Sequence, residues 1–572
     1  MTTPPSHPEQ GPYGSLNPYG GDRLRRPQPS PPPGDPAQGP GPVQGPGLVQ
    51  GPGPVQDGGP GYGPGPAGGS GPVTGPGPVT GPGRRRATVV LAALVAVLLV
   101  AGGVSWYALG GEDEGGGSRA GGAGNGAPAG GRSASPSPPS GTAGSTGPDT
   151  AAAERINAGR APGDARLDWT RKNDIDVPGL GADQFGPWVA GDTVATALYR
   201  TVAGYSVTDG RQKWSLRLDR DICRATPQVS ADGRIVVVTR DGTGSSGECR
   251  VLRMIDLRTG KQGWQQAVAK EGEWDIFSEL STVITGNTVT AGRAGYSTAY
   301  RLGDGTRLFG RGPGTCHPFA FAGGPKLIAA VRCEDGTVDQ PHEQVQELDP
   351  ETGKARWTHE VKRGYHIDHI YSVQPLVVSL YNRAQNKRGV LALTDKGTRR
   401  AALVGPDQYA PGCADRSSAT NDLQTCRTAA DATTFSMATV PTPGLKGTNQ
   451  IVVFSLDTGR VVRRVPAPAG RTVFPLRAAG GELLVEVHPS FQDQSGMLAS
   501  VAPGATTLKT LLRLPPGSAE PHRRMESPRA VYDDGRYTIV AGGIGGSSDA
   551  EEKKRETIMS FTADETTEVP TP

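Results

Sequence analysis

The chain has 572 residues, a length that exceeds one ordinary domain. Its 85 glycines and 53 prolines make up about a quarter of the sequence, aromatic residues contribute 5%, and the formal net charge is +3. This composition argues against one uniform globular core, and the near balance of charge gives no sign of a nucleic-acid-binding domain.

The N-terminal segment 1–83 carries much of the excess, because 46 of its residues are glycine or proline. Such a segment cannot bury enough apolar surface to offset its chain entropy, so we expect a disordered tail. The hexapeptide GPGPVQ at 39–44 and 51–56 is no collagen repeat, since Pro42 stands where a triple helix requires glycine. The tail either docks a cytoplasmic partner or acts as a spacer.

One segment, 84–110, predicts a transmembrane helix with a basic flank. Residues 87–110 contain no charge and are long enough for a hydrocarbon layer of about 30 Å. Three arginines, Arg84 to Arg86, precede this run, and acidic residues follow it at 112–114. The positive-inside rule then predicts a single-pass protein of the cell membrane, with a cytoplasmic N-terminus and an extracytoplasmic C-terminal domain. A cleaved signal peptide is the less favoured alternative, because 83 residues precede the arginines.

The segment 111–160 is rich in Gly, Ala, Ser and Pro, which predicts a flexible extracytoplasmic linker. Near its end Asp149 and Thr150 can cap the run AAAERINA, and Gly159 can stop it, so a short helix is expected there. The sequence from 161 to 565 changes to short β-rich runs, and 566–572 is predicted to be disordered.

All six cysteines follow the predicted membrane helix, on the oxidising side. An even count there predicts disulfides, although six cysteines allow about 15 connectivities. The spacings favour local pairs, and no metal-binding spacing accompanies them. The favoured pairs are Cys223–Cys249, Cys316–Cys333 and Cys413–Cys426.

From about residue 164 a unit of roughly fifty residues recurs. It consists of a strand, a turn that ends in glycine, and a second strand, often with an aromatic residue four positions after that glycine, as in MIDLRTGKQGW at 254–264. Glycine suits the turn because it adopts a positive φ at the least cost. The predicted turn glycines are Gly210, Gly260, Gly305, Gly353, Gly397, Gly459 and Gly504. The predicted blade-packing aromatics are Trp169, Trp214, Trp264, Phe309 and Trp357.

Pairs of apolar strands precede these units, for example GRIVVVTR at 233–240 and PLVVSLYN at 375–382. Four strands in each repeat predict an all-β fold, a β-propeller over 161–565. Seven turn units and a final strand pair favour eight blades, with seven as the alternative. The last blade lacks a fourth strand, and we expect ARLDWTRK at 165–172 to supply it and close the ring.

The pattern D-x-x-T-G-x-x-x-W, present at 256–264 and 349–357, resembles the repeat of pyrroloquinoline-quinone-like (PQQ-like) propellers. Quinone-dependent dehydrogenases share this repeat. If the resemblance extended to their active site, it would imply a disulfide of two adjacent cysteines and a calcium ion held by acidic and amide side chains. Here no two cysteines are adjacent, and their catalytic aspartate has no match. We therefore predict no catalytic, cofactor-binding or metal-binding residue, and no cofactor.

His366 and His369 could share a metal only on a helix, and the surrounding alternation predicts a strand on which they face opposite sides. The expected function is that of a membrane-tethered, non-enzymatic interaction scaffold or sensor, which binds envelope or secreted proteins through the propeller loops. Resemblance to the propeller lipoproteins that assist outer-membrane protein assembly supports scaffolding. The alternative is a quinone-dependent dehydrogenase.

Overall fold

The computed structural model describes residues 147–563, except 180, 244–246, 278–279, 313, 406, 414–421, 445 and 491–493. All of the described residues belong to one compact unit. The predicted tail, the predicted membrane helix, most of the predicted linker and the C-terminal segment 566–572 lie outside the described residues. None of the helices that the structure describes is long and apolar enough to cross a membrane.

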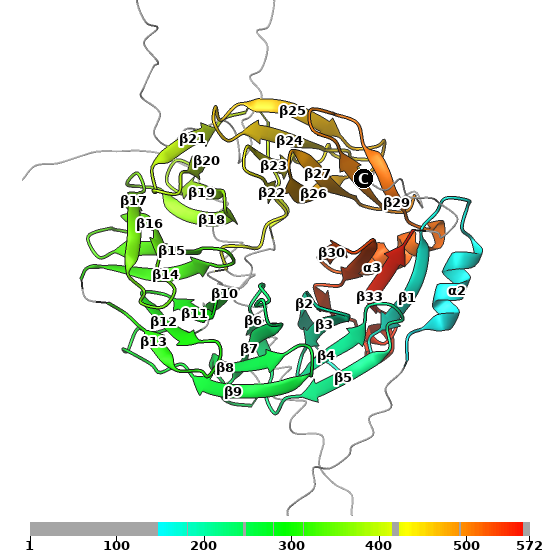
Figure 1. The fold of residues 1–572 in the computed structure, drawn as a ribbon, viewed down its shortest axis with the longest axis horizontal. Coiled ribbons are helices and arrows are strands. Elements are labelled where there is room, and N and C mark those ends of the chain that lie inside the picture. Colours follow the sequence, from blue (N-terminus) through cyan, green and yellow to red (C-terminus); the bar gives the residue numbers. More distant parts are fainter. Residues whose placement is uncertain are drawn as a thin grey trace, which may run out of the picture. The chain divides into compact units, whose positions relative to one another are not determined.

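The described strands form eight sheets arranged as the blades of a ring, which confirms the predicted eight-bladed propeller (Figure 1). Blade 1 contains β2 (Ala182–Ala190), β3 (Thr193–Leu198), β4 (Thr201–Ser206) and β5 (Gln212–Arg217). Blade 2 contains β6 (Ile222–Ala225), β7 (Arg234–Arg240), β8 (Cys249–Asp256) and β9 (Lys261–Ala267). Blade 3 contains β10 (Ser281–Thr285), β11 (Thr288–Arg293), β12 (Tyr296–Arg301) and β13 (Arg307–Phe309). Blade 4 contains β14 (Cys316–Ala322), β15 (Leu327–Cys333), β16 (Glu343–Leu348) and β17 (Ala355–Glu360).

The second half of the ring repeats this order. Blade 5 contains β18 (His366–Val373), β19 (Leu376–Asn382), β20 (Lys387–Leu393) and β21 (Arg399–Leu403). Blade 6 contains β22 (Ala429–Ala430), β23 (Thr434–Ala438), β24 (Gln450–Ser455) and β25 (Val461–Pro466). Blade 7 contains β26 (Val473–Ala479), β27 (Glu482–Val487), β28 (Met497–Val501) and β29 (Lys509–Arg513). Blade 8 contains β30 (Arg529–Asp533), β31 (Arg536–Val540), β33 (Glu556–Thr562) and, from the other end of the domain, β1 (Arg166–Lys172).

Strand β1 closes the ring, as predicted for ARLDWTRK. It pairs antiparallel with β33, so that Trp169 stands opposite Ser560 (Figure 1). A second link joins the same two regions, because the short strand β32 (Gly543–Ile544) pairs with the inner strand β2 of blade 1. Both links tie the C-terminal part of the propeller to its N-terminal part.

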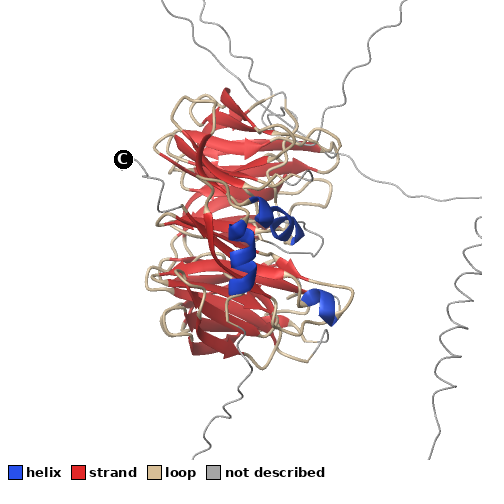
Figure 2. Cartoon of the chain, turned by 90° about the vertical axis from the view of Figure 1, so that its right-hand side faces the viewer, coloured by secondary structure: helices blue, strands red, loops and turns tan. Residues whose placement is uncertain are grey.

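The predicted short helix is present as α2 (Thr150–Ala158). The Asp149 side chain accepts a hydrogen bond from the Ala152 amide, and Gly159 ends the helix. Asn157 bonds both backbone groups of Leu167, so the helix packs on β1. Residues 147–160 are therefore part of the propeller body rather than of the flexible linker predicted to extend to 160. Figure 2 shows α2, α3 (Ala519–Arg524) and α4 (Asp549–Glu552) at this side of the ring; a 3-10 turn, η2 (Pro516–Ser518), precedes α3.

The hydrophobic core consists of eight clusters, one at each interface between neighbouring blades. An aromatic side chain of an outer strand lies over the turn glycine of the next blade in five of these interfaces. Trp214, for example, lies on Gly260, and its Nε1–H donates to the Leu257 carbonyl at 3.0 Å. All seven predicted turn glycines have positive φ, between 68° and 76°.

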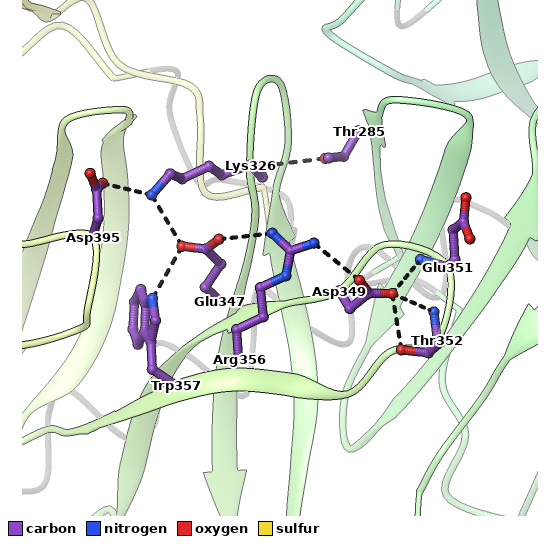
Figure 3. Close-up of polar contacts among 9 residues, drawn as sticks. All are labelled: Thr285, Lys326, Glu347, Asp349, Glu351, Thr352, Arg356, Trp357 and Asp395. Atoms are coloured by element: carbon purple, nitrogen blue, oxygen red, sulfur yellow. Dashed lines mark hydrogen bonds and ion pairs between the residues drawn. The ribbon is translucent and has the colours of Figure 1, made fainter.

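Trp357 keeps this position over Gly397 but uses a different acceptor. Its Nε1–H donates to Glu347 at 3.1 Å, and Glu347 also pairs with Lys326 and Arg356 (Figure 3). Lys326 reaches Asp395 of blade 5 at 2.7 Å, so the network joins the two blades. A carboxylate thus replaces the usual backbone carbonyl at this interface.

The two faces of the ring differ in their connections. Because each blade has four antiparallel strands, every inner strand runs in the same direction, and the connections alternate between two faces. The turn face carries the short turns with the predicted glycines. The other face, called the loop face below, carries the long connections 404–428, 514–528 and 541–555.

Candidate binding cavity

The inner strands of the ring enclose a cavity of about 660 Å³. Strands β2, β6, β26 and β30 supply much of its wall, and residues 412–413, 422–428 and 527–528 of two loop-face connections supply much of the rest. Much of the lining is apolar or aromatic, including Phe185, Trp188, Phe321, Phe474 and Val531. A cavity of this size accepts a small molecule or a few side chains of a protein.

The described residues of the connection 404–428 between blades 5 and 6, called the insertion below, contact the inner strand β18 and the turns that follow β6 and β14. The Gln424 side-chain oxygen accepts from the Gly323 amide at 2.8 Å, and its side-chain nitrogen donates to the Gly323 carbonyl at 3.1 Å. Gln228 donates to the same Gln424 oxygen at 2.8 Å. The Ile370 amide of β18 donates to the Leu423 carbonyl at 2.9 Å. In Figure 1 the yellow chain that leads to β22 runs along the inner edge of the ring.

Arg427, in the last part of the insertion, brings a fixed positive charge to the cavity wall. It donates to Nε2 of His488 at 2.7 Å and to the Pro528 carbonyl, and its guanidinium lies 5.2 Å from the centre of the Phe474 ring. Glu486 lies 3.9 Å from Arg427 and accepts a hydrogen bond from Tyr537 at 2.7 Å. Blades 7 and 8 therefore hold this arginine in one orientation.

The two histidines behind Arg427 both have a lowered pKa and are neutral at neutral pH. Burial, with Arg427 and His522 as further causes, holds the pKa of His488 well below its usual value, so that its Nε2 accepts from Arg427. Burial and then Arg427 lower the pKa of His522 to about 4. A neutral His488 has its Nε2 lone pair free to accept from Arg427, so this residue positions the arginine, and His522 packs against His488.

Arg529, at the start of β30, is a second cation of the lining. It donates to the Gln184 carbonyl at 3.2 Å, and its side chain is exposed to solvent. The lining thus combines aromatic surface with two arginines, Arg427 and Arg529, and two carboxylates, Asp422 and Glu486. Aromatic and arginine side chains are those that contribute most to protein–protein binding.

The predicted site residues lie in three places. All six cysteines are paired as expected from their spacing, Cys223–Cys249, Cys316–Cys333 and Cys413–Cys426, and all three disulfides lie at the loop face. The last one lines the cavity. The predicted aromatics lie at blade interfaces, and the predicted glycines lie on the turn face. Sequence reasoning missed Arg427, Glu486 and Arg529, because they come from different blades and share no motif.

The two histidines of β18 have different partners. His366 pairs with Glu343 of blade 4 at 3.1 Å. His369 is buried, stacks on Tyr371 and has a ring nitrogen within 4.8 Å of the sulfurs of Cys413 and Cys426. Because those sulfurs are bonded to each other, they are not available to a metal.

The residues present do not fit a quinone with its calcium ion. Among the described lining residues the single side-chain amide, Gln424, is bonded to Gly323 and Gln228. Glu486 is bonded to Tyr537 and lies beside Arg427. The disulfide of the lining joins residues 13 apart rather than neighbours. The oxygen donors that calcium prefers are therefore not gathered at the described part of this cavity.

The fold is an eight-bladed β-propeller whose repeats are similar to the PQQ-like pattern. Residues 155–311 match the sequence model of the family described as outer membrane protein assembly factor BamB. No curated protein matches the sequence.

Solved structures with a similar fold include BamB from Moraxella catarrhalis, at 13% identity and a TM-score of 0.39 over 70% of this chain and 100% of that one. A second is the quinohemoprotein alcohol dehydrogenase from Comamonas testosteroni, at 13% identity and a TM-score of 0.40 over 73% of this chain and 83% of that one.

Proposed function

We propose that this chain is a membrane-tethered extracytoplasmic propeller that binds envelope or secreted proteins at its loop face, as a scaffold or sensor without catalysis. The apolar segment 87–110 and the arginines before it support the tether and its orientation. Three disulfides support an oxidising, extracytoplasmic location for the propeller.

The observation that carries the proposal is the cavity with its fixed arginines. Arg427 is held by His488 and Pro528, and Arg529 is held by Gln184, so neither must be ordered when a partner arrives. Aromatic surface surrounds them. We infer that a partner segment with apolar side chains and a carboxylate enters from the loop face, because it would match both parts of this lining.

A quinone-dependent dehydrogenase is the second candidate, and the repeat pattern favours it. The lining argues for binding instead, since the Gln424 amide and the Glu486 carboxylate are already bonded within the protein. A dye-linked assay of the full-length protein with quinone and calcium distinguishes the two. Oxidation of an alcohol or a sugar would contradict the non-catalytic proposal.

Site-specific photo-cross-linking in intact cells tests the binding proposal. A photoreactive residue at Val531 lies in the cavity lining, and one at Asp534 lies in the turn that follows the same strand, on the turn face. We expect a protein adduct at Val531 that Arg529→Ala reduces several-fold, and none at Asp534. Equal adducts at both positions, or an adduct that is insensitive to Arg529→Ala, would contradict the proposed site.

Protease added to intact protoplasts tests the orientation. We expect digestion of the propeller side and protection of residues 1–83. Digestion of the tail with protection of the propeller would reverse the proposed topology.

A further inference from the structure

Three carboxylates from two separate connections meet on the loop face. Asp176 belongs to the connection between β1 and β2, and Asp549 and Glu552 belong to α4 in the connection between β31 and β33. One carboxylate oxygen of each lies within 4.8 Å of the other two. The two aspartates are exposed, whereas Glu552 is only 3% exposed.

Among the described residues, Glu552 has a buried carboxylate oxygen without a partner. Its Oε2 atom is inaccessible to solvent and has no hydrogen-bond partner. Within the part of the chain that the structure describes, no lysine or arginine forms an ion pair with Glu552, Asp176 or Asp549. A buried carboxylate without a partner is strongly unfavourable, and two further negative charges close to it add repulsion.

Another acidic group on the loop face is satisfied in a different way. Asp335 also lies in a cluster of potential ligands, with Cys333 and His342. There Arg363 and His342 both pair with the carboxylate, and Cys333 is part of a disulfide. The absence of such a cation sets the group around Glu552 apart from it.

We propose that Asp176, Asp549 and Glu552 form a calcium-binding site. A divalent cation would neutralise the buried charge and remove the repulsion among the three groups. All three donors are oxygens, which select a hard cation over a transition metal. Two exposed aspartates leave room for water in the remaining positions, and calcium accepts such irregular coordination more readily than magnesium does.

The position of the site gives the cation a structural role in ring closure. The connection with Asp176 follows β1, the strand that completes blade 8, and the connection with α4 precedes β33, the partner of β1. The two connections already touch, because the Asn173 amide donates to the Arg555 carbonyl at 2.9 Å. Bound calcium would fasten the N-terminal and C-terminal parts of the propeller to each other.

Thermal unfolding of the full-length protein tests the site. After treatment with a chelator, we expect about 5 mM CaCl2 to raise the Tm by about 1–3 °C, as a weak extracellular site in a large domain would. Glu552→Gln should abolish this rise. In chelator alone the variant should unfold at or above the wild-type Tm, because it lacks the unpaired buried charge.

Glu551→Gln is the matched control. It changes the net charge equally in the same helical turn, but Glu551 bonds Ser547 and is not a member of the site, so its calcium response should remain. The proposal fails if calcium does not raise the wild-type Tm, or if Glu552→Gln responds as the wild type does. A lower Tm of Glu552→Gln in chelator would show that a protein group holds the carboxylate, and an equal response to MgCl2 would overturn the choice of calcium.

Discussion

The ring contains two kinds of blade interface. At the five interfaces from blade 8 through blade 1 to blade 5, an aromatic side chain of one outer strand covers the turn glycine of the next blade. The five aromatics are Trp169, Trp214, Trp264, Phe309 and Trp357. From blade 5 to blade 7 the equivalent positions hold other residues, and the interfaces are built differently.

Two substitutes replace the missing aromatics. Ala401 stands four residues after Gly397, and at this interface Tyr409 of the insertion packs against Phe454 at 5.7 Å between ring centres. Arg463 stands four residues after Gly459 and donates to the carbonyls of Ala502 and Ala505, beside the turn of blade 7. The first substitute supplies aromatic volume, and the second supplies a donor to a backbone carbonyl.

A docking tryptophan performs both tasks with one side chain. It fills the space above a turn glycine and donates to a carbonyl of the same turn. Where the sequence lacks it, the fold divides the tasks between residues that no repeat pattern connects. Residues 155–311, which match the family model, lie in the half of the ring that the aromatics join.

The largest expected effect is the loss of a docking aromatic at the ring closure. Trp169 is 1% exposed, lies on Gly210 and donates to the Val207 carbonyl at 3.0 Å. Trp169→Ala should lower the free energy of unfolding by about 4 kcal/mol, as measured by urea denaturation. Trp274→Ala is the control, because Trp274 is 80% exposed and should change it by less than about 0.5 kcal/mol. Similar losses in both variants would contradict the role of docking.

Paired glycine substitutions separate docking from turn geometry. Gly260 and Gly504 have φ of 70° and 76°, but a Cβ at Gly260 would stand 2.4 Å from the Trp214 ring, whereas one at Gly504 would meet nothing within 4 Å. Gly504→Ala should cost about 1 kcal/mol, for positive φ alone. Gly260→Ala should cost about 3 kcal/mol, because the ring must also move. Equal costs in thermal or urea unfolding would show that the aromatic contact is dispensable.

Acid should weaken the second half of the ring before the first. The pKa of His522 is about 4 in the folded protein, below the usual value of 6.5, so the unfolded chain binds the extra proton between these values. The neutral state of His522 favours the folded protein fully only above the unfolded pKa of about 6.5. The free energy of unfolding therefore falls as the pH drops towards 4, by about 2 kcal/mol between about pH 7 and 5. At about pH 5, the backbone amides of blades 7 and 8 should exchange hydrogen faster than those of blades 2 and 3. His522→Leu should reduce this difference.

The fold could be predicted further than the site could. Each repeat carries its own turn glycine and alternating strands, so local patterns were enough for eight blades, and the composition of ARLDWTRK was enough for ring closure. The cavity depends on Arg427, Glu486 and Arg529, which meet only after the ring closes. The partly non-aromatic interfaces also escaped prediction, because Tyr409 and Arg463 act through positions that only the assembled blades define.

The smallest expected effect concerns the arginine that replaces an aromatic. Arg463 donates to the Ala502, Ala505 and Gly481 carbonyls of blade 7, and burial lowers its pKa. Arg463→Ala should cost about 1 kcal/mol in urea unfolding, since partly exposed charged hydrogen bonds are lost without a large cavity. Arg460→Ala, on the same strand end with an exposed side chain, should be neutral. If Arg463→Trp has a higher free energy of unfolding than Arg463→Lys, both compared with Arg463→Ala, this position can hold a docking aromatic as the first five interfaces do. If Lys restores more, only the charge matters at this interface.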